Sequence, residues 1–430
     1  MENKIKVVLA KQYDLVVGDT FQLFYRGVIQ APNPYVYSIV AVCEKGKSFP
    51  RYFEYTPQDV GQHTLTVSVY DSDHNVLGSA TTTLNVVKPK RPKNSINVLC
   101  IGDSLTAEGV WVEELHGRIS SSEGEPQGLG FSNVNFVGNC KRGDVGYVAF
   151  GGWTWERFMS DKPGAIWIEA PNNKTEKDQH SLWQDENGAI WQIETLQVDY
   201  LKLNRYEDHT SPRPQSGVLT HYKNAVDTNP IKFYSSSDEK PSPFFDPQKR
   251  CIDFKTYIQR LGIDKIDVVY ILLGGNGRMR PVAINNTNEA YCKIVVEEAK
   301  VLVDKIKADL PNVKVKVMMS QLPSSKGGIG SNYGAHPLLT DYYKSVMYHL
   351  ECNLAYQNWV LQDGYKDFME FINVTGQFDS EYGYPHIEKP VNVRCKTTEW
   401  LDTNAVHPTK EGQMQIADAV YRNLVKEISK

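Results

Sequence analysis

The sequence predicts an α/β fold: a three-layer α/β/α domain with a mostly parallel sheet, preceded by a small all-β sandwich. Continuous apolar runs at residues 96–101, 267–273 and 313–319 are typical of strands covered on both faces. Segments with apolar residues at helical spacing lie between and after these runs. Alternating strands and helices indicate a parallel sheet with helices on both faces. The helices are expected at 254–261, 289–310, 339–350 and 411–428.

The N-terminal part, residues 1–88, is expected to be all-β. Short segments rich in Val, Thr and Tyr alternate apolar with polar or small residues, and clusters of Gly, Pro, Asn and Asp separate them. This pattern is typical of a small antiparallel sandwich. The stretches 55–57 and 63–67 resemble the later strands of bacterial immunoglobulin-like modules. A basic, proline-bearing segment at 89–95 is expected to be a linker to the domain at 96–430.

Residues 160–250 are expected to be an insertion in the α/β domain. They are polar, rich in Trp and Tyr, and lack long helical periodicity. Asn187-Gly188 between two Trp-bearing runs predicts a hairpin over 181–193. The insertion is interpreted as a lid or substrate-binding flap. Trp153, Trp155, Trp183 and Trp191 form either a sugar-stacking surface or a buried core, and the core is the favoured interpretation.

Composition excludes several classes of protein. The chain has 430 residues, 41% of them hydrophobic and 23% charged, which is too apolar for wholesale disorder and long enough for two domains. A formal net charge of −4 gives no reason to expect a nucleic-acid partner. No apolar run is long enough to cross a membrane, so no membrane insertion is expected. The oligomeric state is left open.

Seven single cysteines without a C-x-x-C pair argue against a zinc ribbon or a disulfide scaffold, and the histidines show no metal-ligand spacing. No metal site is expected. Residues 1–10 have no signal-like apolar region with a small-residue cleavage site. The chain is therefore either cytoplasmic or a periplasmic or secreted protein whose targeting segment is not part of this sequence.

A candidate nucleophile follows the first buried strand directly. Ser104 lies in Gly102-Asp103-Ser104-Leu105, ahead of an expected helix, at the sheet edge where open α/β sheets bind ligands. A serine hydroxyl needs a base to attack an ester, and His407 in Asn404-Ala405-Val406-His407-Pro408 supplies one.

Acyl transfer also needs hydrogen-bond donors directed at the developing oxyanion. Asn276 follows the second buried strand and brings an amide to the same edge as Ser104. Gly152 in Gly151-Gly152-Trp153-Thr154 offers an unobstructed backbone N–H. The expected oxyanion hole is Ser104 N–H, Gly152 and Asn276.

These four blocks, in this order, resemble the SGNH (GDSL) esterase superfamily. Ser104, Gly152, Asn276 and His407 match the serine, glycine, asparagine and histidine of its four blocks. The resemblance covers residues 96–430. The bacterial branch that includes carbohydrate esterases is the one that three further motifs resemble: Gly152-Trp153-Thr154-Trp155, Pro243-Phe244-Phe245 and Gln415-Ile416-Ala417-Asp418. It implies an SGNH/flavodoxin-like fold, ester hydrolysis through an acyl-enzyme on Ser104, and no cofactor.

The sequence departs from the family pattern twice. Gly277 stands where the third block usually has aspartate, and Asn404 stands where the last block has the aspartate that supports the histidine. An asparagine cannot stabilise an imidazolium as a carboxylate does. Asp402 is the nearest carboxylate, and a backbone carbonyl or a Ser–His dyad are the alternatives.

The predicted function is hydrolysis of O-acyl esters, with acetyl esters of carbohydrate as the expected substrate and other small esters as alternatives. A lipase or thioesterase remains an alternative enzyme. A non-catalytic carbohydrate-binding protein on a decayed esterase fold is the alternative from another class, motivated by Gly277 and Asn404.

Overall fold

The computed structural model describes residues 4–430 except 160–165, 170–173, 175, 197–199, 208–215, 235–241, 247–248, 250, 280–285 and 326–341. The chain divides into two compact units. One comprises Met1–Trp155 and Ile258–Lys430, and the other comprises Glu156–Tyr257. The N-terminal module and the α/β domain, which the sequence separates by a linker, therefore belong to the same unit.

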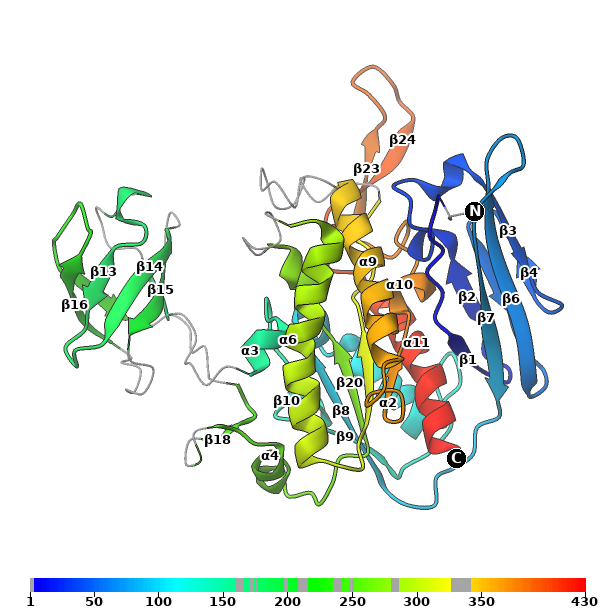
Figure 1. Cartoon of the computed structure of the whole chain (residues 1–430), viewed down its shortest axis with the longest axis horizontal. Helices are drawn as coiled ribbons and strands as arrows, with labels where there is room; N and C mark the ends of the chain where they lie inside the picture. Colours follow the sequence, from blue (N-terminus) through cyan, green and yellow to red (C-terminus); the bar gives the residue numbers. More distant parts are fainter. Residues whose placement is uncertain are drawn as a thin grey trace. The chain divides into compact units, whose positions relative to one another are not determined.

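The N-terminal module is built from two sheets, as the sandwich prediction requires (Figure 1). One sheet has the order β1-β7-β6-β3 and the other β2-β5-β4. The prediction of a purely antiparallel module is wrong at one edge, because β1 pairs in parallel with β7. The strands are β1 (Gln12–Val16), β2 (Phe21–Phe24), β3 (Ser38–Val42), β4 (Lys47–Ser48), β5 (Tyr52–Tyr55), β6 (Gly61–Tyr70) and β7 (Val76–Val87), with 3₁₀ turns η1 (Tyr25–Gly27) and η2 (Pro34–Val36).

The central sheet confirms the predicted fold class. Its order is β10-β11-β8-β20-β21-β22, and β9 also pairs with β8. Every pairing is parallel except that of β10 with β11. The three apolar runs of the sequence are its central strands β8, β20 and β21. The strands are β8 (Ile96–Gly102), β9 (Val134–Val137), β10 (Cys140–Arg142), β11 (Val145–Ala149), β20 (Val268–Leu272), β21 (Lys314–Met318) and β22 (Met369–Phe371).

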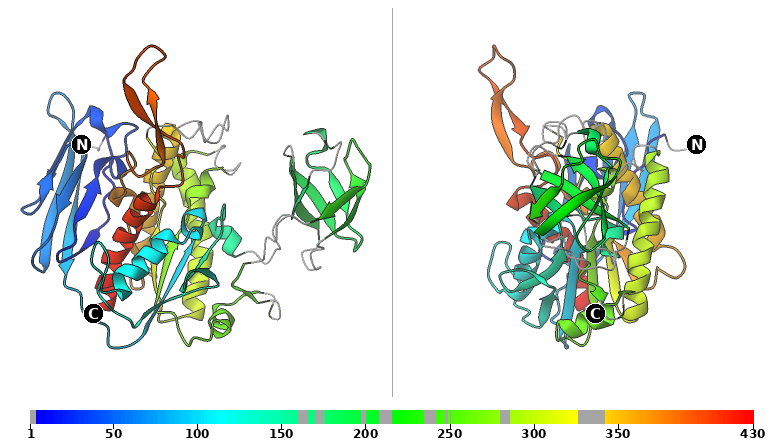
Figure 2. Two further views of the ribbon diagram at one scale, coloured as in Figure 1. Left: turned by 180° about the vertical axis from the view of Figure 1, so that it is seen from behind. Right: turned by 90° about the vertical axis from the view of Figure 1, so that its left-hand side faces the viewer.

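Helices cover both faces of this sheet. Helices α2 and α11 pack together on one face, and α6 and α9 pack together on the other (Figure 2). A continuous apolar core joins α2 and α11 to the strand residues that point toward them, such as Cys100, Tyr270 and Leu272. The helices are α1 (Ser104–Ala107), α2 (Val110–Ser120), α3 (Trp155–Phe158), α6 (Asn288–Asp309), α9 (Tyr342–Val360), α10 (Val374–Gln377) and α11 (Lys410–Ile428), with the 3₁₀ turn η4 (Gly275–Met279).

Two differences from the predicted elements concern the C-terminal third. The helix expected at 339–350 continues to Val360 as α9. A two-stranded hairpin, β23 (His386–Pro390) and β24 (Thr398–Asp402), was not predicted. Among the described residues, no helix combines the length and the apolar character that crossing a membrane requires.

The second unit contains a six-stranded sheet with the order β12-β15-β14-β13-β16-β17. The predicted hairpin is confirmed: Trp183 of β13 lies opposite Trp191 of β14, and Asp185 accepts hydrogen bonds from the N–H groups of Asn187 and Ala189 in the turn. Both Trp side chains are fully buried, which confirms the core interpretation. The elements are β12 (Ile166–Glu169), η3 (Glu176–Asp178), β13 (Leu182–Gln184), β14 (Ile190–Leu196), β15 (Tyr200–Glu207), β16 (Ser216–Lys223), β17 (Ile231–Tyr234), β18 (Phe245–Asp246), β19 (Cys251–Ile252) and α4 (Phe254–Arg260), whose last residues lie in the first unit.

A buried ion-pair cluster joins the N-terminal module to the α/β domain. Asp19 of the module contacts Arg118 of α2 at 2.5 Å and Arg422 of α11 at 2.6 Å, and all three side chains are buried. Burial raises the pKa of Asp19, but the charges of Arg422 and Arg118 outweigh burial and hold that pKa below its usual value. Asp19 is therefore ionised and fixes the orientation of the module on the domain.

Replacing Asp19 with Asn should lower the free energy of unfolding at pH 7 by about 3–5 kcal/mol, because two buried guanidinium groups lose their shared counter-charge. The folded pKa of Asp19 lies below the ordinary 3.8, so its contribution is complete above pH 3.8 and disappears as pH falls through the folded pKa. Urea unfolding of wild type and variant should therefore differ most near pH 7 and converge in acid. The exposed Asp59→Asn is the control, and equal stability of both variants would contradict the assigned role.

Candidate active site

The turn after β8 presents Ser104 at the carboxyl edge of the parallel sheet. Asp103 caps the short helix α1, with its Oδ1 accepting the N–H of Leu105 at 3.1 Å. The strand end must be glycine, because a Cβ on Gly102 would lie 2.0 Å from Oγ1 of Thr106. This close approach of strand and helix leaves Ser104 half-buried at the start of α1.

The structure brings Ser104 and His407 together although 303 residues separate them. Nε2 of His407 lies 3.0 Å from Oγ of Ser104. His407 lies in the loop between β24 and α11, and Oδ1 of Asn404 holds this loop by accepting the N–H groups of Val406 at 3.0 Å and His407 at 2.9 Å. The distance and the groups are those of a serine hydroxyl with its general base.

Neither candidate for the third member contacts the imidazole. Oδ2 of the buried Asp402 accepts a hydrogen bond from Oγ of Ser324, and Asn404 uses Oδ1 on the loop backbone. In the described part of the chain, no hydrogen bond to Nδ1 of His407 is present. The involvement of Asp402 or Asn404 in the chemistry stays a prediction. Among the described residues, the hydrogen bonds of the structure link only Ser104 to the His407 ring.

The two other predicted oxyanion residues lie on neighbouring turns. Nδ2 of Asn276 donates to Oδ2 of Asp103 at 3.0 Å and to the carbonyl of Trp153 at 3.2 Å, so the amide is fixed between the serine turn and the glycine turn. Gly152 has φ +76° and open space where a Cβ would be. A Cβ on the preceding Gly151 would lie 3.9 Å from that of Ser104. The Gly151-Gly152 turn is therefore beside the serine.

Replacing Asn276 with Ala should lower kcat about 10²–10³-fold on a small ester and leave KM nearly unchanged, because an oxyanion donor acts mainly in the transition state. Steady-state kinetics with 4-nitrophenyl acetate measure both constants, and thermal unfolding checks that the variant is folded. A rise in KM with unchanged kcat would instead make Asn276 a ground-state binding group.

Gly277, the first departure from the family pattern, has a structural reason. A Cβ at this position would lie 2.8 Å from the hydroxyl of Tyr291 and 3.0 Å from that of Tyr348. The Tyr291 hydroxyl also donates to the carbonyl of Gly277 at 2.5 Å. Two tyrosines thus occupy the space that an aspartate would need, and the turn carrying Asn276 is held by them instead.

A narrow pocket adjoins Ser104 and Asn276. Its lining includes the buried polar side chains of Ser320, Gln321 and His349. Ser320 and His349 form a second Ser–His pair, with Oγ and Nε2 3.2 Å apart. The Ser345 carbonyl accepts from Nδ1 of His349 at 2.7 Å, so Nε2 is the acceptor for the Ser320 hydroxyl. Sequence reasoning missed this pair, although Ser320 follows a buried strand as Ser104 does.

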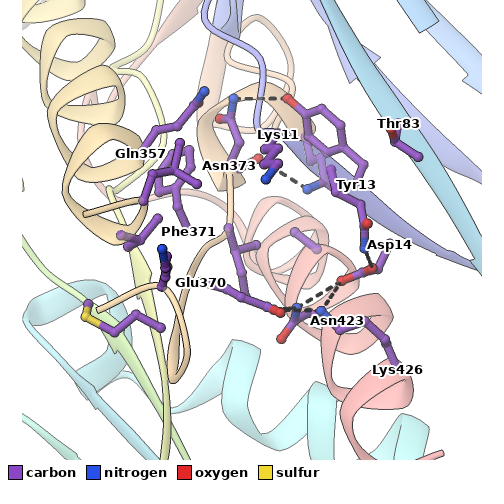
Figure 3. A pocket seen from close by; sticks show the side chains of 18 residues that line it. Lys11, Tyr13, Asp14, Thr83, Gln357, Glu370, Phe371, Asn373, Asn423 and Lys426 are labelled. Carbon is purple, nitrogen blue, oxygen red and sulfur yellow. Dashed lines mark hydrogen bonds and ion pairs between the residues drawn. The ribbon is translucent and has the colours of Figure 1, made fainter. Parts of the chain in front are cut away.

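A second cavity, of about 330 Å³, does not adjoin the serine. It lies between β1 and β7 of the N-terminal module and β22, α9 and α11 of the domain (Figure 3). Lys426 contacts Asp14 at 3.0 Å and Glu370 at 2.6 Å, and Asn423 donates to both carboxylates. These paired charges join the module to α11. Among the described residues, no group of three or more His, Cys, Asp or Glu side chains is placed to hold a metal ion.

Comparisons with known proteins return solved structures only: no protein-family model and no curated protein matches the sequence. The chain is structurally similar to a carbohydrate acetylesterase family member from Sinorhizobium meliloti (12% identity, TM-score 0.33, covering 78% of this chain and 99% of that one). It is also similar to a carbohydrate esterase family 2 enzyme with a carbohydrate-binding domain from Corynascus thermopiles (Myceliophthora fergusii). The identity is 12% and the TM-score 0.30, and the match covers 99% of this chain and 92% of that one. An M. smegmatis aryl esterase is similar at 10% identity and a TM-score of 0.31, and the match covers 77% of this chain and 98% of that one. Sequence identities of 10–12% and TM-scores of 0.30–0.33 assign no activity to this chain.

Proposed function

We propose that this chain is a serine ester hydrolase that forms an acyl-enzyme on Ser104. The observation that carries the proposal is the 3.0 Å contact between Oγ of Ser104 and Nε2 of His407 at the carboxyl edge of the parallel sheet. Ser320 is the other serine of the pocket that contacts a histidine, but it is 3% exposed, whereas Ser104 is half-buried. An ester carbonyl has access to Ser104 more readily than to Ser320.

The reaction follows from these groups. His407 Nε2 takes the hydroxyl proton as Oγ of Ser104 attacks the ester carbonyl. The tetrahedral oxyanion accepts hydrogen bonds from the Ser104 and Gly152 N–H groups and from Asn276, whose Nδ2 exchanges its bond to the Trp153 carbonyl for the oxyanion. The imidazolium then gives its proton to the leaving alcohol, and the acyl group remains on Ser104. Water, deprotonated by His407, attacks this acyl-enzyme and releases the acid and the free serine.

The proposed substrate is a short acyl ester, with the acetyl group on a carbohydrate. The pocket beside Ser104 is narrow, and Ser320, Gln321 and His349 make part of its wall polar. A long fatty acyl chain needs more room than this narrow pocket offers, so a lipase fits it poorly. The resemblance of residues 152–155, 243–245 and 415–418 to the branch that includes carbohydrate esterases supports a sugar as the alcohol part of the ester.

A fluorophosphonate probe tests the nucleophile directly. The probe should add its phosphonyl group to Oγ of Ser104 with loss of fluoride, and peptide mass spectrometry locates the adduct. Ser104→Ala should remain unlabelled, whereas Ser320→Ala should be labelled as wild type is. Labelling at Ser320, or no labelling of folded protein, would overturn the proposal.

A further inference from the structure

Exposed aromatic side chains lie on and beside the hairpin β23–β24, whose strands are joined by short segments to Tyr384 and His407 of the candidate active site. The hairpin projects from the α/β domain in Figure 1 and in both views of Figure 2. Trp400 on β24 is 39% exposed, and Tyr382 just before β23 is 49% exposed. Each of the six other Trp side chains whose burial the structure describes is at most 7% exposed. Trp400 is therefore exceptional among the Trp side chains whose burial is described.

Trp400 belongs to an ordered aromatic cluster. The His386 ring stacks on it with centroids 3.7 Å apart and an interplanar angle of 13°, and Tyr382 meets it edge-on at 5.4 Å and 72°. The strand register explains the stack: His386 lies opposite Asp402 and Trp400 opposite Glu388, so His386 and Trp400 are diagonal neighbours on one face. The three rings are held before any ligand arrives.

The cluster is also fixed to the body of the protein. The Arg51 guanidinium lies over the Tyr382 ring at 4.6 Å and contacts Asp379 at 2.5 Å. The N–H of Thr403 donates to the carbonyl of Pro385 at 2.7 Å and closes the base of the hairpin. An aromatic surface held in this way loses little conformational entropy when a ligand binds.

Both strands of the hairpin lead to the candidate active site. Tyr384, which lies between Tyr382 and His386 in the sequence, lines the pocket that contains Ser104. At the other end, β24 finishes at Asp402, and His407 follows five residues later. Short chain segments at both ends of the hairpin therefore connect the aromatic cluster to residues of the candidate active site.

We propose that Tyr382, His386 and Trp400 form a subsite for a pyranose ring of the carbohydrate that carries the ester. The inference rests on the proposed function of Ser104. Aromatic faces and edges pack against the C–H groups of a sugar ring while its hydroxyls stay in water, which suits a half-exposed cluster. The hairpin 386–402 has three acidic residues and three Lys or Arg residues, so its formal charge is zero. This balance favours a neutral glycan over a polyanion.

Trp400→Ala tests the subsite by comparing two kinds of substrate. The measured quantity is kcat/KM on acetylated xylan or acetylated glucomannan divided by kcat/KM on 4-nitrophenyl acetate, which has no sugar. We expect this ratio to fall about tenfold, mainly through KM, because the aromatic contact acts on binding. Trp400→Phe, which keeps an aromatic face, should retain most of the ratio. Val393→Ala, at the fully exposed Val393 of the same hairpin, is the matched control and should leave the ratio unchanged.

A binding experiment separates the subsite from catalysis. The Ser104→Ala variant should be retarded by acetylated xylan or glucomannan in native affinity electrophoresis, and Ser104→Ala/Trp400→Ala should be retarded less. An unchanged ratio and unchanged retardation in the Trp400 variants would overturn the inference. It would also be overturned if wild type sediments as a dimer, Trp400→Ala sediments as a monomer, and the substitution has no effect on either glycan, because the cluster would then be a contact between two copies of the chain. If wild type cleaves 4-nitrophenyl acetate but neither glycan, the sugar subsite fails while the proposed ester hydrolase stands. Activity that survives in Ser104→Ala would instead overturn the proposed function itself.

Discussion

Alanine at Ser104 or at His407 is expected to lower kcat on 4-nitrophenyl acetate by about 10⁴-fold or more, and the double variant should be no worse than either single variant. The reason is that nucleophile and base act as one unit across the 3.0 Å contact, so removing either group removes the whole covalent route. Single and double variants are compared by steady-state kinetics, with the protein concentration checked for trace wild type.

The second Ser–His pair of the same pocket provides the matched control. Ser320→Ala and His349→Ala remove the same chemical groups from the 3.2 Å contact, and each is expected to change kcat less than tenfold. Losses at Ser104 and His407 that simply multiply in the double variant would show that the two residues act independently. Larger losses at Ser320 and His349 would transfer the nucleophile to that pair.

The second large effect concerns the carboxylate that the histidine lacks. Asn404→Asp should keep the loop folded, because a carboxylate oxygen can accept the N–H groups of Val406 and His407 as the amide oxygen does. The added negative charge near the ring stabilises the imidazolium, and we expect kcat/KM to rise about tenfold or more. Asp402→Asn should change kcat/KM less than tenfold, because its carboxylate is bonded to Ser324.

The pH dependence of kcat/KM distinguishes the alternatives. The proposed mechanism requires neutral His407, and a nearby carboxylate raises the pKa of a histidine, so the ascending limb of the Asn404→Asp profile should move to higher pH. Thermal unfolding of each variant serves as the folding control. A loss of several orders of magnitude in Asp402→Asn would instead make Asp402 the third member of a triad. An unmoved limb in Asn404→Asp would show that residue 404 does not reach the imidazole.

The central sheet could be predicted because its signal is local. Strands β8, β20 and β21 are buried on both faces, and burial on both faces leaves a continuous apolar run in the sequence. Helix α9 was predicted too short, because its C-terminal half lacks a clear polar face: Tyr356, Trp359 and Val360 are all buried there. The hairpin β23–β24 was missed because its mostly exposed strands alternate weakly between apolar and polar residues.

The fold class could be predicted from the sequence alone, and so could the strand-end positions of Ser104 and Asn276 and the presence of a histidine before the last helix. Strand burial, turn residues and motif order are properties of short segments. The contacts of His407 with Ser104 and of Asp402 with Ser324 are visible only in the folded chain, since they depend on the path of a loop after a hairpin. The exposure of the aromatic side chains likewise depends on the packing of the whole chain. Trp183 and Trp191 fill the core of a small sheet, whereas Trp400 lies on a hairpin too thin to have a core.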